Sequence, residues 1–163
     1  MPNQPQYEQQ QVTVGCAITA FLEQCGVKAA FGVISIHNMP ILDAFAQRGA
    51  IRFISARGEA GAGNMADAYA RSTASLGVCV TSTGPAAGNI AGSMVEALTA
   101  GAPLLHITGQ IETPFIDKGM SYIHEALDQL TMLKAVSKAA LEMALSMVSW
   151  SGASWMYDIP RSM

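Results

Sequence analysis

Glu59 is the residue whose type and position most suggest chemistry. It follows a short apolar run with strand character, residues 51–55, and begins a segment rich in Ala and Gly, residues 59–71. No other acid follows before Asp67. The dipole of a helix favours an acid in its first turn by about 0.3–1 kcal/mol, so the position has a purely structural explanation. A functional role depends on which loops lie beside Glu59.

A second loop that could bind a ligand follows the apolar run at residues 76–82. Gly84 and Pro85 break that run, and Asn89 follows four residues after Pro85. A loop of this kind lets a ligand approach the backbone, since glycine has no side chain in the way. The segment lacks the lysine of a Walker loop, which makes nucleoside triphosphate binding improbable. The alternative interpretation is that this segment is an ordinary strand-to-helix turn that binds no ligand.

The three histidines lie in different settings. His37 lies in a loop, His106 lies inside an apolar run, and His124 precedes Glu125. We expect His106 to be a hydrogen-bonded core residue and His124 to lie on a helix surface. No second histidine lies at helical spacing from His124, so the sequence predicts no metal site. A GxSxG nucleophile elbow is also absent.

The stretch 61–66, GAGNMA, matches the glycine spacing of a dinucleotide-binding loop. In such a loop the glycines form the turn itself, and phosphate binds at the helix N-terminus. Here Glu59 precedes the glycines and would place a negative charge at the phosphate position. We therefore expect the small residues to let this helix pack closely on a neighbour, with dinucleotide binding as a weaker alternative.

Composition narrows the possible partners. Half of the 163 residues are hydrophobic and 13% are charged, so we expect part of the surface to be buried against another chain or domain. The net charge of −3 argues against a nucleic-acid partner. The longest apolar stretch, 90–107, contains Glu96 and Pro103 and is no membrane span.

The cysteines and the N-terminus indicate a cytoplasmic protein. Cys16, Cys25 and Cys79 form no CxxC pair and are expected to be free thiols in a reducing cytosol. Residues 1–11, MPNQPQYEQQQ, lack the features of a signal peptide and are expected to form a disordered leader or arm. The remainder, 12–163, is expected to be a single domain.

Helices and strands are predicted to alternate along the chain. Helices are expected at 12–25, 38–47, 59–71, 86–100, 122–133 and 139–148; strands at 28–33, 51–55, 76–82, 104–108 and 154–159; a loop at 109–121 and a short extended piece at 134–137. This order predicts a doubly wound α/β fold, a mainly parallel sheet with helices on both faces. Ligands bind such sheets at the carboxyl ends of the strands, where Glu59, the Gly84–Pro85 turn and the loops 35–38 and 109–121 all converge.

The run from Phe31 to Ala139 resembles the pyrimidine-binding (PYR) domain of thiamine diphosphate enzymes of the acetolactate synthase, benzaldehyde lyase and oxalyl-CoA decarboxylase group. The matching motifs are Arg57-Gly58-Glu59, Met65-Ala66-Asp67-Ala68-Tyr69-Ala70-Arg71, Gly77-Val78-Cys79 through Gly84-Pro85 to Asn89, Ile107-Thr108-Gly109-Gln110, and His124-Glu125. They occur in the family's order and cover about two thirds of the chain.

The resemblance implies a cofactor and a role for Glu59. The glutamate of this motif hydrogen-bonds N1′ of the thiamine diphosphate aminopyrimidine and so promotes proton removal from thiazolium C2. Gly84, Pro85 and Asn89 would help to bind the cofactor, while His124, Gln110 and His37 would lie on the substrate side. The implied substrates are small molecules, 2-keto acids or similar carbonyl compounds, and the implied reaction is decarboxylation or carboligation.

The sequence also departs from the family pattern. Gly58 replaces a common histidine, Ala86 replaces the second glycine of the turn, and His124 replaces a common glutamine. The stretch between 139 and 154 is shorter than usual by roughly one helix. These departures leave the substrate class open.

A larger departure is that the diphosphate-binding motif, Gly-Asp-Gly with a downstream Asn, does not occur in these 163 residues. Mg²⁺ and the diphosphate would therefore be held by a partner diphosphate-binding (PP) domain or subunit. A homodimer through the PYR domain is expected, with the small-residue helix at 86–100 as the contact. The alternatives are a non-catalytic relic or regulatory dimerisation module and, more remotely, a Rossmann-like nucleotide binder.

Overall fold

A computed structural model describes residues 13–141 of the chain. Its helices are α1 (Val14–Gln24), α2 (Met39–Arg48), α3 (Glu59–Thr73), α4 (Pro85–Asn89), α5 (Ala91–Ala100) and α6 (Gln129–Ala135), with a 3₁₀ helix η1 (Thr113–Phe115). Its strands are β1 (Ala29–Gly32), β2 (Arg52–Ser55), β3 (Gly77–Thr81) and β4 (Leu104–Thr108). Helical segments and strands alternate from α1 to β4, as the sequence predicts, with the two helices α4 and α5 between β3 and β4.

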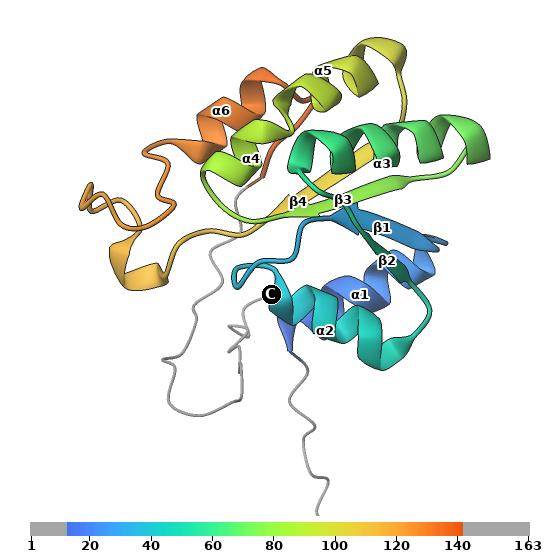
Figure 1. The fold of residues 1–163 in the computed structure, drawn as a ribbon, viewed down its shortest axis with the longest axis horizontal. Helices are drawn as coiled ribbons and strands as arrows, with labels where there is room; N and C mark the ends of the chain where they lie inside the picture. The colour runs from blue at the N-terminus through green and yellow to red at the C-terminus, as the bar shows by residue number, and fades with distance from the viewer. Residues whose placement is uncertain (1–12, 142–163) are drawn as a thin grey trace, which may run out of the picture.

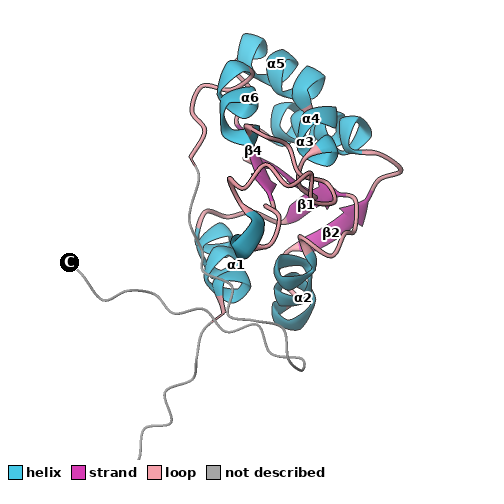
Figure 2. Cartoon of the chain, turned by 90° about the vertical axis from the view of Figure 1, so that its left-hand side faces the viewer, coloured by secondary structure: helices cyan, strands magenta, loops and turns pink. Residues whose placement is uncertain are grey.

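The four strands form one parallel sheet in the order β2-β1-β3-β4. Helices α1 and α2 cover one face, and α3, α4, α5 and α6 lie on the other (Figures 1 and 2). The prediction of a doubly wound parallel α/β fold is thus confirmed. Strand β2 lies on one side of β1 and the next strand, β3, lies on the other side, so the order in which strands are added to the sheet reverses between β1 and β3. In open α/β sheets, ligands bind outside the carboxyl ends of the strands at such a reversal.

Each face of the sheet has its own hydrophobic core because side chains alternate along a strand. On the α1–α2 face, Ala30 and Val78 pack with Leu22 and Phe45. On the α3 face, Phe31 and Cys79 belong to a second cluster of buried apolar residues. Both central strands are buried along their whole length, as expected for a sheet covered on both sides.

Helix α3 packs on the sheet and on α5 through small residues. Its buried positions are Ala62, Gly63, Ala66 and Ala70. A Cβ at Gly63 would lie 2.6 Å from Ile90 Cγ1 and 2.7 Å from Ser93 Cβ. The prediction that these small residues serve close packing is therefore confirmed at Gly63, whereas Gly61 has no neighbour within 4 Å of a built Cβ.

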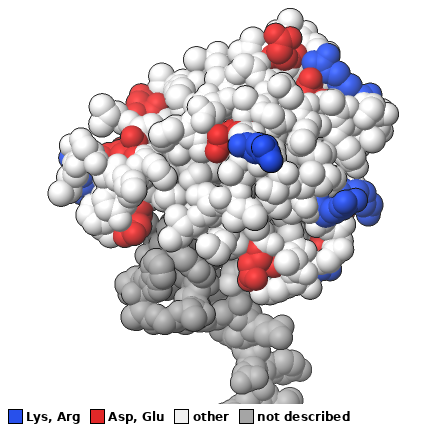
Figure 3. Space-filling view, in the orientation of Figure 1, with Lys and Arg blue, Asp and Glu red and all other residues white. Residues whose placement is uncertain are grey.

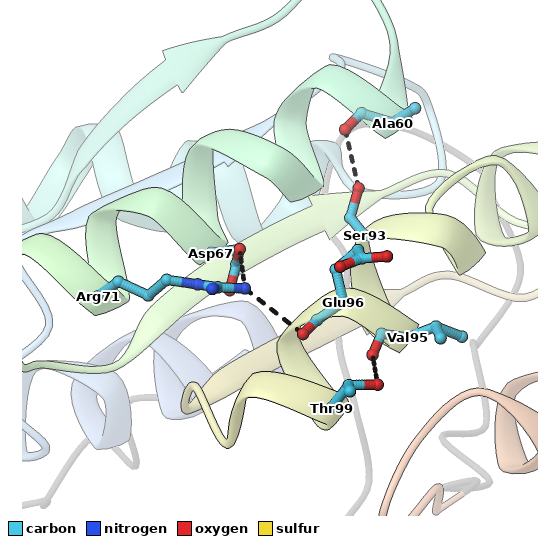
Figure 4. A network of polar contacts seen from close by, with 7 residues as sticks. All are labelled: Ala60, Asp67, Arg71, Ser93, Val95, Glu96 and Thr99. Atoms are coloured by element: carbon cyan, nitrogen blue, oxygen red, sulfur yellow. Dashed lines mark hydrogen bonds and ion pairs between the residues drawn. The ribbon is translucent and has the colours of Figure 1, made fainter.

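Polar contacts between α3 and α5 accompany this close approach (Figure 4). The Ser93 hydroxyl donates to the Ala60 carbonyl at 3.0 Å. Farther along the helices, Arg71 pairs with Asp67 at 2.8 Å and also donates to the Glu96 carbonyl at 3.4 Å. Hydrogen bonds therefore join α3 and α5 at both ends of their contact.

Two predicted helices differ in the structure. The helix expected at 86–100 is divided into α4 and α5 at Ile90, whose side chain is fully buried and whose N–H bonds to Gly88 O. The helix expected at 122–133 begins only at Gln129, because the Asp128 side chain caps the Thr131 N–H at 2.9 Å. His124 therefore lies in a loop, with φ 63°, and the prediction that it lies on a helix surface is wrong.

Smaller corrections concern the end of the described chain. The extended piece expected at 134–137 is wrong in its first half, since α6 continues to Ala135. Residues 139–141 are not helical, and the remainder of the helix expected at 139–148 lies outside the described residues. The expected leader at 1–11 and the strand at 154–159 also lie outside them.

Charged side chains are dispersed over the face of the molecule that Figure 3 shows. Acidic and basic groups stand singly or in small groups on the face in view, which is mostly uncharged (Figure 3). Exposed apolar side chains include Val95 and Leu98 of α5, at 42% and 45% exposure. Between residues 13 and 141, none of the helices is long and apolar enough to cross a membrane.

His106 of β4 is hydrogen-bonded, as predicted, but it is half-buried and lies outside the two clusters of core residues. Its Nε2 lies 2.8 Å from the Thr81 hydroxyl of the neighbouring strand. Burial lowers the pKa of His106 to about 4, because the charged imidazolium is disfavoured away from water. The folded protein therefore keeps this ring neutral at pH values where the unfolded chain protonates it.

This difference predicts a loss of stability in mild acid. As the pH falls from about 6.5, the usual histidine pKa, towards about 4, the unfolded state gains a proton that the folded state does not. Up to about 3 kcal/mol of stability would be lost across this window. Urea denaturation between pH 4 and 8 should give a shallower pH dependence for His106→Gln than for the parent chain; parallel curves would contradict the prediction.

The packing of α3 makes a second prediction with a matched control in the same helix. Gly63→Ala should destabilise the fold by about 1–3 kcal/mol, because the added methyl group meets Ile90 and Ser93. Gly61→Ala meets no neighbour and should leave stability unchanged or raise it by up to about 1 kcal/mol through helix propensity. Urea denaturation of both variants measures the difference, and equal effects would show that the helix contact is not tight.

Candidate functional site

A hydrogen-bonded cluster spans the point between β1 and β3 where the chain reverses across the sheet. Ser35 follows β1, and Ser82 follows β3. Their hydroxyl oxygens are 2.7 Å apart, with Ser35 as donor. His37 Nδ1 lies 3.1 Å from Ser82 Oγ and 3.5 Å from Ser35 Oγ. The loop 35–38 and the strand end at Ser82 therefore meet, as the parallel topology predicts.

His37 is partly shielded by neighbouring loops. Its ring is centred 5.9 Å from that of His124, and a Cβ at Gly109 would lie 2.8 Å from His37 Cβ. Burial lowers the pKa of His37, the positive potential of His124 lowers it further, and Glu112 acts in the opposite direction. The imidazole is thus biased towards its neutral form.

The Gly84–Pro85 turn is fixed by Gln129, the first residue of α6. The Gln129 Oε1 accepts from the Gly84 N–H at 2.6 Å and from the Thr83 hydroxyl at 3.0 Å. Its Nε2 donates to the Gly109 carbonyl at 3.0 Å. One buried amide therefore joins the loops that follow β3 and β4 to the start of α6.

Glycine is required at position 84 for two reasons. Its φ of 57° is left-handed, and a Cβ there would overlap the carbonyl oxygen of His124. Gln110 reinforces the same junction, since its Oε1 accepts from the Ile111 N–H at 2.9 Å and lies 3.3 Å from the Thr83 hydroxyl, whose one proton it shares with Gln129. Gln110 and the backbone of His124 thus lie beside the turn.

The loop 109–128 has internal structure of its own. The rings of Phe115 and Tyr122 stack with centroids 4.3 Å apart, and the Tyr122 hydroxyl donates to Glu112 at 3.1 Å. Residues Asp117, Ser121 and His124 all have positive φ values, between 54° and 63°. Such backbone is uncommon outside glycine, so the loop conformation must be imposed by its contacts.

Glu59 is held at the N-terminus of α3 by a residue of α4. The Asn89 Nδ2 donates to Glu59 Oε2 at 3.0 Å. The Glu59 side chain is half-buried. Burial of the Cys79 thiol raises the pKa of Cys79 to about 12, and the negative charge of Glu59 adds to this effect. A carboxylate with one oxygen oriented by an amide, beside a buried neutral thiol, is suited to accept a hydrogen bond from a polar ring.

The structure brings the sequence-predicted site residues together in two groups. Glu59 contacts Asn89, while His37, Gln110 and the backbone of His124 lie around the Gly84 turn; Pro85 follows that turn and is exposed. Sequence reasoning missed Ser35, Ser82 and Gln129. Gln129 carried a usable signal, because Asp128 and Thr131 form a local helix cap that places Gln129 at a helix start.

The fold and this edge define a class: a parallel α/β domain whose polar loops converge at the carboxyl ends of its strands. Comparison with known proteins specifies the family. The family described as "Thiamine pyrophosphate enzyme, N-terminal TPP binding domain" matches residues 12–132. The chain belongs to this family.

The similar proteins are enzymes of related kinds. The chain is 35% identical over 137 residues to a probable 2-ketoarginine decarboxylase of Pseudomonas aeruginosa, covering 84% of this chain and 24% of that protein. It is 36% identical over 121 residues to glyoxylate carboligase of Escherichia coli O157:H7, with 74% and 20% covered. It is 38% identical over 99 residues to the acetolactate synthase isozyme 1 large subunit of Escherichia coli K12, covering 61% of this chain and 18% of that protein. The chain thus spans about a quarter of these relatives or less.

The residues present fit one half of thiamine diphosphate. Glu59 offers a half-buried carboxylate for a ring nitrogen, and the Gly84 turn offers a backbone without side-chain obstruction. In the described part of the chain, residues 13–141, no group of three or more His, Cys, Asp or Glu side chains could hold a metal ion. The carboxylate and the open turn therefore suit the aminopyrimidine of that cofactor.

The Gln129 bridge predicts a large effect on stability. Gln129→Leu would leave the Gly84 N–H and the Gly109 carbonyl without this buried partner and should cost about 2–4 kcal/mol. Gln47→Leu is the matched control, because Gln47 is exposed, and should change stability by less than about 0.5 kcal/mol. Urea denaturation compares the two; a Gln129 effect as small as the control would refute the bridge.

Proposed function

We propose that this chain supplies the pyrimidine-binding half of a thiamine diphosphate-dependent decarboxylase or carboligase that acts on 2-keto acids or similar carbonyl compounds. The observation that carries the proposal is the Glu59–Asn89 pair at the carboxyl edge of the sheet, in a chain of this family. The printed activities of the similar proteins, 2-ketoarginine decarboxylase and glyoxylate carboligase, support the reaction class.

Glu59 is the catalytic residue of this proposal. Asn89 holds Oε2, which directs the carboxylate and leaves Oε1 to face a ring nitrogen, N1′ of the aminopyrimidine. Bound thiamine diphosphate would supply an electron sink for the carbanion formed at the substrate carbonyl. Glu59 would share a proton with N1′ and so help to move a proton away from the reactive carbon.

Gly84, Pro85 and Asn89 are the proposed cofactor-binding residues. The Gly84 N–H is already bonded to Gln129, so this turn would contact the ring mainly through its shape and its backbone carbonyl groups. Helix α4 begins at Pro85 and carries Asn89 at its other end, so one rigid turn of helix couples the two contacts.

The substrate side is assigned to His37, Gln110 and His124. Neutral His37 lies at the reversal between β1 and β3, where a ligand is expected in this type of sheet. His124 is exposed beside it and Gln110 lies at the adjacent loop. These side chains would contact the polar groups of a small keto acid and would select among substrates.

A partner completes the site in this proposal. A diphosphate-binding domain or subunit would provide the ligands for Mg²⁺ and the diphosphate, for which the described residues offer no cluster. A homodimer through this domain and a cytoplasmic location are further parts of the proposal. They are supported by the exposed Val95 and Leu98 of α5 and by the free cysteines Cys16, Cys25 and Cys79.

The test uses the chain assembled with thiamine diphosphate, Mg²⁺ and a subunit that carries a diphosphate-binding domain from an adjoining reading frame. Exchange of the thiamine C2 proton for deuterium is followed by NMR, and CO₂ release from 2-keto acids is measured in parallel. Glu59→Gln should slow the C2 exchange by a factor on the order of 10² to 10⁴, because the proton relay is lost.

The matched control is Glu96→Gln, an exposed acid on α5 that should leave exchange unchanged. An equal exchange rate in the parent and the Glu59→Gln assembly would sink the catalytic role. Absence of decarboxylation and carboligation in the parent assembly would instead favour a non-catalytic dimerisation module, in which Glu59 only stabilises the start of α3.

A further inference from the structure

The two serines beside His37 form a chain of hydroxyl groups that ends on one nitrogen of the imidazole. The Ser35 hydroxyl donates to Ser82 Oγ at 2.7 Å, and Ser82 Oγ lies 3.1 Å from His37 Nδ1. Ser82 is buried, with 7% of its surface exposed. None of the activities proposed above explains why two hydroxyl groups from the segments that follow β1 and β3 should meet at this ring.

Accounting for the protons assigns a direction to this chain. A serine hydroxyl has a single proton to donate, and Ser82 already accepts from Ser35. The Ser82 proton is then available to His37 Nδ1, and when Ser82 donates it, Nδ1 is the acceptor. A neutral imidazole carries one N–H, which in this arrangement is on Nε2.

Both serines are fixed by further bonds. The Ser35 N–H donates to Asn38 Oδ1 at 2.9 Å, and the Asn38 amide donates to the Val33 carbonyl at 2.9 Å. The Ser82 carbonyl accepts from the hydroxyls of Thr81 and Thr108, at 3.0 and 2.5 Å. These bonds hold the backbone on both sides of the hydroxyl chain, so the two serine oxygens are kept within reach of each other and of the ring.

We propose that Ser82, oriented by Ser35, is a positioning residue that holds His37 as the Nε2–H tautomer, so that His37 presents a hydrogen-bond donor to a carbonyl or carboxylate oxygen of the substrate. The substrate part of this inference rests on the proposed function of the site. The tautomer part rests only on the contacts within the chain. Burial, which lowers the pKa of His37, keeps the ring in the neutral form in which a tautomer exists.

The tautomer is tested on the 163-residue chain alone, without cofactor or partner. A long-range ¹H–¹⁵N spectrum of the ¹⁵N-labelled protein at pH 8 distinguishes a protonated from an unprotonated imidazole nitrogen. The parent should show His37 with Nε2 protonated and Nδ1 unprotonated. Ser82→Ala should give a mixture of both tautomers, because Nδ1 loses its donor.

Two further variants separate a specific effect from a structural one. Ser93→Ala removes a hydroxyl bonded to the Ala60 carbonyl and should leave the His37 signals unchanged. Ser35→Ala, which keeps the Ser82 hydroxyl, should give a smaller shift towards the mixture than Ser82→Ala and serves as the test if Ser82→Ala fails to fold. A parent with Nδ1 protonated, or serine variants with an unchanged tautomer, would overturn the proposal.

The functional half is tested in the assembled enzyme. Ser82→Ala should lower kcat/KM for a 2-keto acid by up to about tenfold, the effect of one misdirected hydrogen bond, while C2 exchange stays at the parent rate. An unchanged kcat/KM would overturn the role in substrate binding. Failure of the whole thiamine assignment would appear differently, as a parent assembly without C2 exchange but with the Nε2–H tautomer intact.

Discussion

The close approach of α3 to the sheet is the constraint on which the rest of this domain depends. A Cβ at Gly77 would overlap the Ala66 carbonyl, and Gly63 leaves room for Ile90 and Ser93 of the neighbouring helical segment. Because the helix lies so near to β3, its first residue, Glu59, is held at the carboxyl edge of the sheet and close enough to Cys79 to affect the thiol. The small residues thus fix the position of the carboxylate without touching it.

A second set of contacts gives this edge its shape. Gln129 joins the loops after β3 and β4, and Ser35 joins the loop after β1 to the end of β3. Parallel topology brings the strand ends to one edge, but it does not decide how the loops lie there. Those loops are oriented by polar side chains whose partners lie 20 to 47 residues away in the chain.

Much of this domain could be predicted from its sequence because its two central strands, β1 and β3, lie in continuous, largely apolar runs and because Gly, Pro and Asn lie between many of its elements. The places of Glu59 and Asn89 relative to those runs made both residues candidates, and the structure joins them by a hydrogen bond. The helix starting at Gln129 was misplaced because apolar spacing from Tyr122 onward resembles a helix, whereas the cap at Asp128 and the positive φ of His124 decide the outcome. The break at Ile90 was missed because it depends on burial against α3, a contact that the local sequence does not carry.

The backbone of His124 has a consequence for how such a site could diversify. Its carbonyl group, and not its imidazole, fills the space above Gly84, so the turn requires a glycine at 84 but no particular side chain at 124. The loop between Ile111 and Asp128 is otherwise secured by its own contacts and by Gln129 at its far end. Substitutions along this loop can therefore alter the side chains beside the Gly84–Pro85 turn while the turn keeps its form. The carbonyl of His124 fixes the turn, whereas its exposed imidazole can be exchanged without altering that backbone contact.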